Sequence, residues 1–141
     1  MRFWDASAIV PLVVAEAPSE QLLHLLEEDP ALLVWWGTPV ECAAALARRE
    51  REGAIPAPLA ATARDRLRLL ESAWHEILPT DVVRTAALRV LRLHPLRAAD
   101  SLQLAAAIVA AEHDPAHLEF ISLDDRLSDA AAREGFRLVR L

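Results

Sequence analysis

Short apolar runs alternate with longer amphipathic stretches along this chain. The short runs predict strands near Met1–Asp5, Leu32–Trp36, His75–Leu78, Glu119–Leu123 and Arg137–Val139. The longer stretches predict helices near Ala6–Val14, Ser19–Glu27, Pro39–Glu52, Pro58–Ser72, Asp81–Leu93, Ala98–Glu112 and Arg126–Glu134. Strands that alternate with helices are typical of a parallel sheet covered by helices, so the pattern indicates an α/β fold.

One of these predicted helices has a clear period. Within Pro58–Ser72, Leu59, Ala63, Leu67 and Leu70 fall on one face at helical spacing. Gly53 follows a charged run and predicts the end of the preceding helix. No linker, repeat or low-complexity segment divides the sequence. We therefore expect one domain over residues 1–141, with two helices inserted between the second and third strands.

Composition narrows the possible classes of protein. The chain has 141 residues, of which 54% are hydrophobic, so it is long and apolar enough to fold without disulfides. It has a single Cys, no apparent secretion signal and no apolar run near the ~20 residues that span a bilayer. We expect a soluble cytoplasmic protein that does not insert into membranes.

The absence of Lys and the small number of Gly exclude the common nucleotide-binding motifs. All fifteen basic residues are Arg, so no Lys is present for a phosphate-binding Walker A loop. Three scattered glycines cannot form a dinucleotide-binding loop. The net charge of −6 argues against a protein that coats nucleic acid, yet it allows an enzyme that attracts cations to an acidic cleft.

Four acidic residues occur where a predicted strand ends or a predicted helix begins: Asp5, Glu41, Asp100 and Asp124. The carboxyl ends of parallel strands share one edge of a sheet, and ligands bind at that edge. Four carboxylates gathered there would repel one another, and a divalent cation would remove that repulsion. Mg²⁺ and Mn²⁺ prefer oxygen ligands, so the pattern indicates a metal-dependent phosphodiester site.

Helix capping is an alternative interpretation of these acids. Thr38 followed by Glu41 matches a capping box, and so does Asp100 followed by Gln103. Asp124 or Asp125 could cap the helix that follows. Asp5 is harder to explain in this way, because it lies between apolar segments where an unpaired carboxylate is unfavourable. The two interpretations can coexist.

The motifs together resemble the PIN domain, and within it the VapC-type toxins of bacterial type II toxin–antitoxin pairs. The resemblance rests on Asp5-x-Ser7, on Glu41 in a helix that begins with Pro, on the segment Leu96–Ala105 around Asp100, and on Ser122-Leu123-Asp124 with Leu127 and Gly135. It covers nearly the whole chain. It implies a three-layer α/β/α sandwich with a mostly parallel sheet of about five strands, and an endoribonuclease that depends on Mg²⁺ or Mn²⁺.

The resemblance also implies roles for particular residues. Asp5, Glu41, Asp100 and Asp124 would be the catalytic and metal-binding acids, with Asp125 an alternative to Asp124. Ser7 would orient Asp5 or its metal-bound water, and Ser122, two residues before Asp124, matches a Ser or Thr that the family often has there as a supporting residue. Whether one cation or two acts is left open, and so is whether Glu41 binds a cation or positions the attacking water as a base.

Arginines beside these acids are candidates for binding the substrate phosphate. Arg97 is the first choice and Arg126 the second, and a solvent-exposed side chain without a ligand is the alternative for each. Arg48, Arg49 and Arg51 are interpreted as a solvated helix end. Of the adjacent pair Trp35 and Trp36, one is expected in the core, because neighbouring strand residues face opposite sides.

Three partners follow from the resemblance: an RNA substrate, a cognate antitoxin protein and a second copy of the chain in a homodimer. The antitoxin would lie across the acidic cleft, and the helices between Pro39 and Ser72 are candidates for the dimer contact. The main alternative is a catalytically silent PIN scaffold that binds RNA or protein. A DNA nuclease or a metal-dependent phosphatase is a further alternative.

Overall fold

A five-stranded, all-parallel sheet forms the centre of the protein in a computed structural model that describes residues 1–141. Its strands are β1 (Arg2–Trp4), β2 (Leu32–Trp35), β3 (His75–Ile77), β4 (Glu119–Ile121) and β5 (Arg137–Leu138), in the order β3-β2-β1-β4-β5. All five strands occur where the sequence pattern predicts them.

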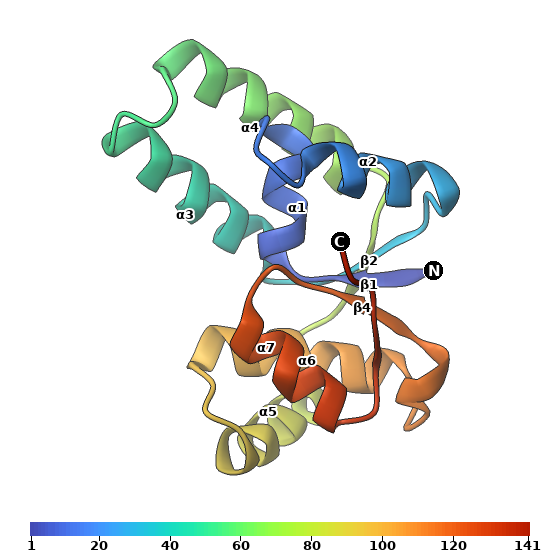
Figure 1. The fold of residues 1–141 in the computed structure, drawn as a ribbon. Coiled ribbons are helices and arrows are strands. Elements are labelled where there is room, and N and C mark those ends of the chain that lie inside the picture. The colour runs from blue at the N-terminus through green and yellow to red at the C-terminus, as the bar shows by residue number, and fades with distance from the viewer.

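Helices cover both faces of the sheet in two layers (Figure 1). One layer holds α1 (Ala6–Val13), α2 (Ser19–Glu28), α3 (Thr38–Arg51) and α4 (Ala57–Glu71). The other holds α5 (Asp81–Leu93), α6 (Ala98–Ala110) and α7 (Asp125–Arg133), with a short 3₁₀ helix at Pro115–His117 before β4. The predicted three-layer α/β/α architecture is confirmed.

Alternating strand residues build the two cores. Phe3 and Phe120 stack at 5.3 Å between ring centroids on the side of α5–α7, whereas Trp4 packs on the side of α1–α4. The Trp pair divides as predicted, because Trp35 is buried and Trp36 is 52% exposed. Each face of the central strands therefore contributes to a separate hydrophobic core, as expected of a sheet buried on both sides.

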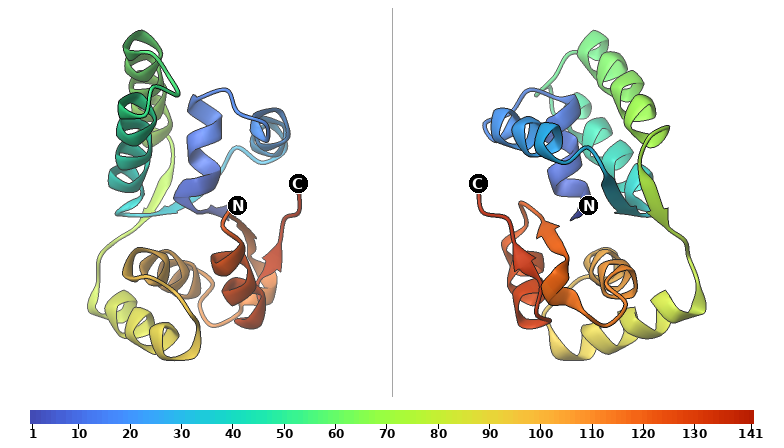
Figure 2. Two further views of the ribbon diagram at one scale, coloured as in Figure 1. Left: turned by 60° about the vertical axis from the view of Figure 1, so that its left-hand side comes forward. Right: turned by 90° about the vertical axis from the view of Figure 1, so that its right-hand side faces the viewer.

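The strand order reverses at β1. The chain moves from β1 outward to β2 and β3, and then crosses to β4 on the opposite side of β1 (Figures 1 and 2). The backbone N–H of Asp5 donates to the Ile121 carbonyl at 2.9 Å, so the ends of β1 and β4 stay together. A crevice forms at such a reversal, on the carboxyl edge of the strands.

Several local predictions need correction. Leu59 is exposed, and the buried face of α4 runs instead through Ala60, Ala63 and Leu67. The 3₁₀ helix was not predicted. Gly53 ends α3 as predicted, with a φ of +74° that favours glycine. None of the helices has the length and apolar character needed to cross a membrane.

Candidate functional site

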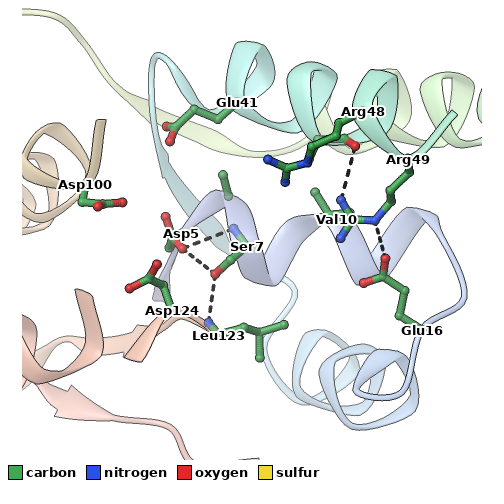
Figure 3. A pocket seen from close by; sticks show the side chains of 12 residues that line it. Asp5, Ser7, Val10, Glu16, Glu41, Arg48, Arg49, Asp100, Leu123 and Asp124 are labelled. Atoms are coloured by element: carbon green, nitrogen blue, oxygen red, sulfur yellow. Dashed lines mark hydrogen bonds and ion pairs between the residues drawn. The ribbon is translucent and has the colours of Figure 1, made fainter. Parts of the chain in front are cut away.

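A pocket of about 300 Å³ lies on the carboxyl edge of the sheet, where the strand order reverses. Its lining includes all four acids that the sequence pattern singled out: Asp5, Glu41, Asp100 and Asp124. Each comes from a different part of the chain, after β1, in α3, in α6 and after β4. Figure 3 shows their carboxylates pointing toward a common space from different sides.

Asp5 lies deepest of these acids, with only 4% of its surface exposed. Contrary to the expectation from the sequence, Asp5 also caps the N-terminus of α1, where its carboxylate accepts a hydrogen bond from the backbone N–H of Ser7. The Ser7 hydroxyl donates to the same carboxylate oxygen at 2.5 Å, and the Ser122 hydroxyl donates to it at 3.0 Å. Ser7 contacts Asp5 as predicted, and the structure adds that Ser122 contacts the same carboxylate oxygen.

The two serines also connect the loops that follow β1 and β4. The backbone N–H of Leu123 donates to the Ser7 hydroxyl at 2.9 Å, and that of Asp124 donates to the Ser122 hydroxyl at 3.0 Å. These bonds fix the backbone of both loops at the point where the strand order reverses. Asp124 is held beside Asp5 as a result.

Glu41 is oriented by a contact that the sequence did not indicate. Its carboxylate accepts a hydrogen bond of 2.6 Å from the side-chain amide of Gln103, which comes from α6. The capping-box interpretation is wrong here, because α3 begins at Thr38 after Gly37 and has no side-chain cap. Glu41 is therefore free of a capping role and faces the pocket.

Asp100 and Asp124 each take part in capping a helix and line the pocket as well. Asp100 is the third residue of α6 and not its N-cap, as the capping interpretation predicted, and its side chain accepts a weak bond, 3.4 Å long, from the backbone N–H of Arg97, which is the N-cap. Asp124 is the N-cap of α7 and accepts from the backbone N–H of Leu127 at 2.8 Å. Capping and pocket lining coexist at both residues. Asp125 lines only a neighbouring pocket, so Asp124 is the residue placed with the other three acids.

The electrostatics of the pocket disfavour ionised carboxylates. Burial raises the pKa of Glu41 to about 7, with the Gln103 hydrogen bond acting against this and the charges of Asp5 and Asp100 adding to it. Burial likewise raises the pKa of Asp5, although the bonds from Ser7 and Ser122 oppose the shift. Burial also raises the pKa of Asp100, helped by the charge of Asp124.

The chemistry of this donor set fits a hard divalent cation. All the donors are carboxylate or hydroxyl oxygens, and their mutual repulsion would be relieved by a positive ion. As the side chains are placed, however, no group of three or more Asp, Glu, His or Cys has the arrangement of a metal site. The donor chemistry therefore fits a hard cation, although the side-chain positions do not already form its coordination sphere.

A second pocket of about 580 Å³ adjoins the first and carries the arginines. Arg97 and Arg126, both predicted near the site, line this second pocket together with Arg48. Arg48 also lines the first pocket, and its guanidinium points into it in Figure 3. None of the three forms an ion pair, whereas the neighbouring Arg49 is bound to Glu16 at 2.6 Å.

Sequence reasoning missed Arg48 as a site residue. The helical period could have found it, because Arg48 follows Glu41 by seven residues and so lies on the same face of α3. The run of charges from Arg48 to Glu52 concealed that signal. Arg48 is instead an unpaired cation at the mouth of an acidic pocket.

Comparison with solved structures shows the fold of the chain. No protein-family model matches the chain, and no curated protein matches it. Among solved structures, FitAcB from Neisseria gonorrhoeae matches with a TM-score of 0.67 at 14% sequence identity, over 99% of this chain and 97% of that chain. The fold is therefore PIN-like along essentially its whole length.

Proposed function

We propose that this protein is a metal-dependent endoribonuclease and the toxin of a toxin–antitoxin pair. The observation that carries the proposal is the convergence of four carboxylates, from four separate elements, on one pocket at the strand reversal. The likeness of fold to FitAcB and the sequence motifs support a toxin–antitoxin role. The all-oxygen donor set supports Mg²⁺ or Mn²⁺ as the cofactor.

In the proposed mechanism, three of the acids bind the cation and two serines orient one of these acids. Asp5, Asp100 and Asp124 would hold the cation, which supplies a water of lowered pKa and a positive charge near the phosphate. Ser7 and Ser122 keep the Asp5 carboxylate in place through their hydroxyl bonds.

The rest of the pocket would act on the water and on the RNA. Glu41, on the opposite side from Asp124 in Figure 3, orients the attacking water. Arg48, Arg97 and Arg126 bind phosphates of the RNA on either side of the cleaved bond, because they are unpaired and line adjoining pockets.

The same pocket suits a protein partner of opposite charge. An antitoxin segment that carries an Arg would meet the four carboxylates and prevent RNA from entering. The chain's net charge of −6 favours such a cationic segment. We include the antitoxin, and a homodimer of this chain, in the proposal on the basis of the PIN-like fold and motifs.

Cleavage of a mixed tRNA and rRNA pool by the purified protein tests this function directly. The matched controls are EDTA and the isosteric variant Asp5→Asn, which keeps the size of a deeply buried side chain and removes its charge. We expect cuts that require Mg²⁺ or Mn²⁺ and that disappear in both controls.

Other outcomes would contradict the proposal. An intact RNA pool that nevertheless binds the folded, partner-free protein would favour a catalytically silent PIN scaffold. Equal cleavage by Asp5→Asn would show either a contaminating nuclease or a different site. Preferential cleavage of DNA would reassign the substrate.

A further inference from the structure

Gln103 is a fully buried polar side chain beside the pocket. It lies in α6 among buried apolar residues, including Leu104 and Ala107, and none of its surface is exposed. Its amide nitrogen donates to the Thr38 hydroxyl at 3.1 Å and to the Glu41 carboxylate at 2.6 Å. Gln103 thus joins the α5–α7 layer to the start of α3 in the opposite layer.

The amide of Gln103 is only half satisfied. Both N–H groups have partners, but the carbonyl oxygen is buried and has none. A buried polar atom without a partner lowers stability by about 1–3 kcal/mol, a loss that an apolar side chain would not cause. Residues that weaken the fold in this way are expected where function requires them.

The contact also determines how Glu41 is presented. When Glu41 is ionised, the reverse amide orientation would place two oxygen acceptors 2.6 Å apart, so the nitrogen faces the carboxylate. Thr38, itself fully buried, holds the second N–H and prevents the amide from turning. One oxygen of Glu41 is therefore fixed on Gln103, and the other remains available to the pocket.

We propose that Gln103 is a positioning residue, which acts through Glu41 by anchoring one carboxylate oxygen and aiming the other into the acidic pocket. This inference rests on the proposed nuclease function. Its contribution is to limit the rotamers of a flexible side chain before the substrate or a cation arrives. Thr38 serves as the anchor for the amide.

Two apolar substitutions made together distinguish an effect on the position of Glu41 from an effect on the stability of the fold. Gln103→Leu removes the donor, and Thr38→Val removes the hydroxyl that would otherwise be left without its partner. We expect the double variant to remain folded, because the unpartnered amide oxygen is removed together with the hydroxyl and amide groups that would otherwise be left unmatched, yet to cleave RNA about 10–100-fold more slowly in single turnover. A crystal structure of this variant without metal should show Glu41 displaced.

A double-mutant cycle with Glu41→Gln tests whether Gln103 affects the cleavage rate through Glu41. If Gln103 acts through Glu41, Gln103→Leu slows the wild type but causes little further loss in Glu41→Gln. Ser101→Ala is the matched control, since it removes a buried hydroxyl from the same helix whose bond, to the Ala98 carbonyl, does not involve the acids. Its cleavage rate should equal that of the wild type.

Three results would overturn the inference while leaving the nuclease proposal intact: wild-type cleavage by the double variant, an undisplaced Glu41, or an equal loss in the Glu41→Gln background. A wild-type protein that fails to cleave RNA with either metal would refute the nuclease proposal, and the inference with it. If the double variant does not fold, Gln103→Asn gives the same comparison, because its shorter amide cannot span both partners.

Discussion

At the scale of single residues, two acids of this pocket are positioned in part by bonds from residues far away in the sequence. Asp5 is held by Ser7 and Ser122, and Glu41 is held by Gln103. Arg48 is the opposite case, since it has no ion-pair partner and remains available to a ligand. Because Arg48 is unpaired, we predict that it contributes to RNA binding.

Replacing Arg48 with Ala should weaken RNA binding. Loss of one phosphate contact lowers the salt dependence of the binding constant by a slope of about 0.7 for single strands. Arg51→Ala is the matched control, because Arg51 is an exposed arginine of the same helix that lines neither pocket. Fluorescence anisotropy at several salt concentrations, in an Asp5→Asn background, would measure both variants. Equal effects of the two substitutions would show that only the net charge matters.

At the scale of elements, α5 and α7 are tied together by a charged contact away from the pocket. Glu134, which caps the end of α7, accepts hydrogen bonds from Arg89 at 2.6 Å and from His94 at 2.7 Å. Burial favours a higher pKa for Glu134, but the bonds from Arg89 and His94 outweigh it, so the pKa is lowered. The contact therefore depends on an ionised Glu134.

Replacing Glu134 with Gln should lower the free energy of unfolding by about 1.5–3 kcal/mol at neutral pH, the range for hydrogen bonds to charged groups. Because the folded-state pKa is lowered, this contribution is present above the ordinary value of 4.5 and is lost as the pH falls below it. Urea unfolding at pH 7 and pH 4 would measure the difference.

The matched control for this prediction is Asp65→Asn. Asp65 pairs with Arg68 at 2.9 Å, but both side chains are more than 70% exposed, so the loss should be below about 0.5 kcal/mol. If Glu134→Gln lowers the free energy of unfolding no more than Asp65→Asn does, the contact of Glu134 with Arg89 and His94 does not stabilise the fold.

The element scale also shows where sequence patterns succeed and where they fail. Short apolar runs place the strands, most clearly β2, which is buried at every residue because helices cover both faces of the sheet. The buried face of α4 is predicted only in part, since Leu59 and Ala60 are both apolar and only packing selects Ala60. Capping signals at Thr38 and Gln103 mislead, because their side chains bond to each other across layers instead.

At the scale of the whole molecule, the acidic pocket opposes the stability of the fold. Asp5, Glu41 and Asp100 all have raised pKa values, each chiefly through burial. A raised folded-state pKa means that stability is fully present below the unfolded value and is lost as the pH rises through the folded value. For Glu41 this window runs from 4.5 to about 7.

The metal-free protein should therefore lose stability as the pH rises across that window. Glu41→Gln keeps the shape and the acceptor for Gln103 but removes the titrating group, so its stability should fall less steeply with pH. Melting temperatures in EDTA between pH 4.5 and pH 7.5 would give the comparison. Identical slopes for the two proteins would show that Glu41 does not titrate in this range.

Saturating Mg²⁺ or Mn²⁺ should oppose this loss of stability with rising pH. A cation binds only the ionised carboxylates, so its stabilising effect should grow as the pH rises. Differential scanning calorimetry with and without metal at pH 5 and pH 7.5 would measure it, with Asp5→Asn as the control that has lost a ligand. A melting temperature unaffected by either metal at both pH values would contradict the proposed cofactor.

The sequence by itself determined the order of strands and helices, the α/β class and the four acids that follow strand or helix boundaries. These are local properties, set by hydrophobic periodicity and by the positions of acids beside apolar runs. Only the tertiary structure decided that the strand order reverses at β1, and that Gln103 rather than a helix cap holds Glu41. Both join residues far apart in the sequence, and a local pattern carries no signal for contacts that form only when separate layers pack together.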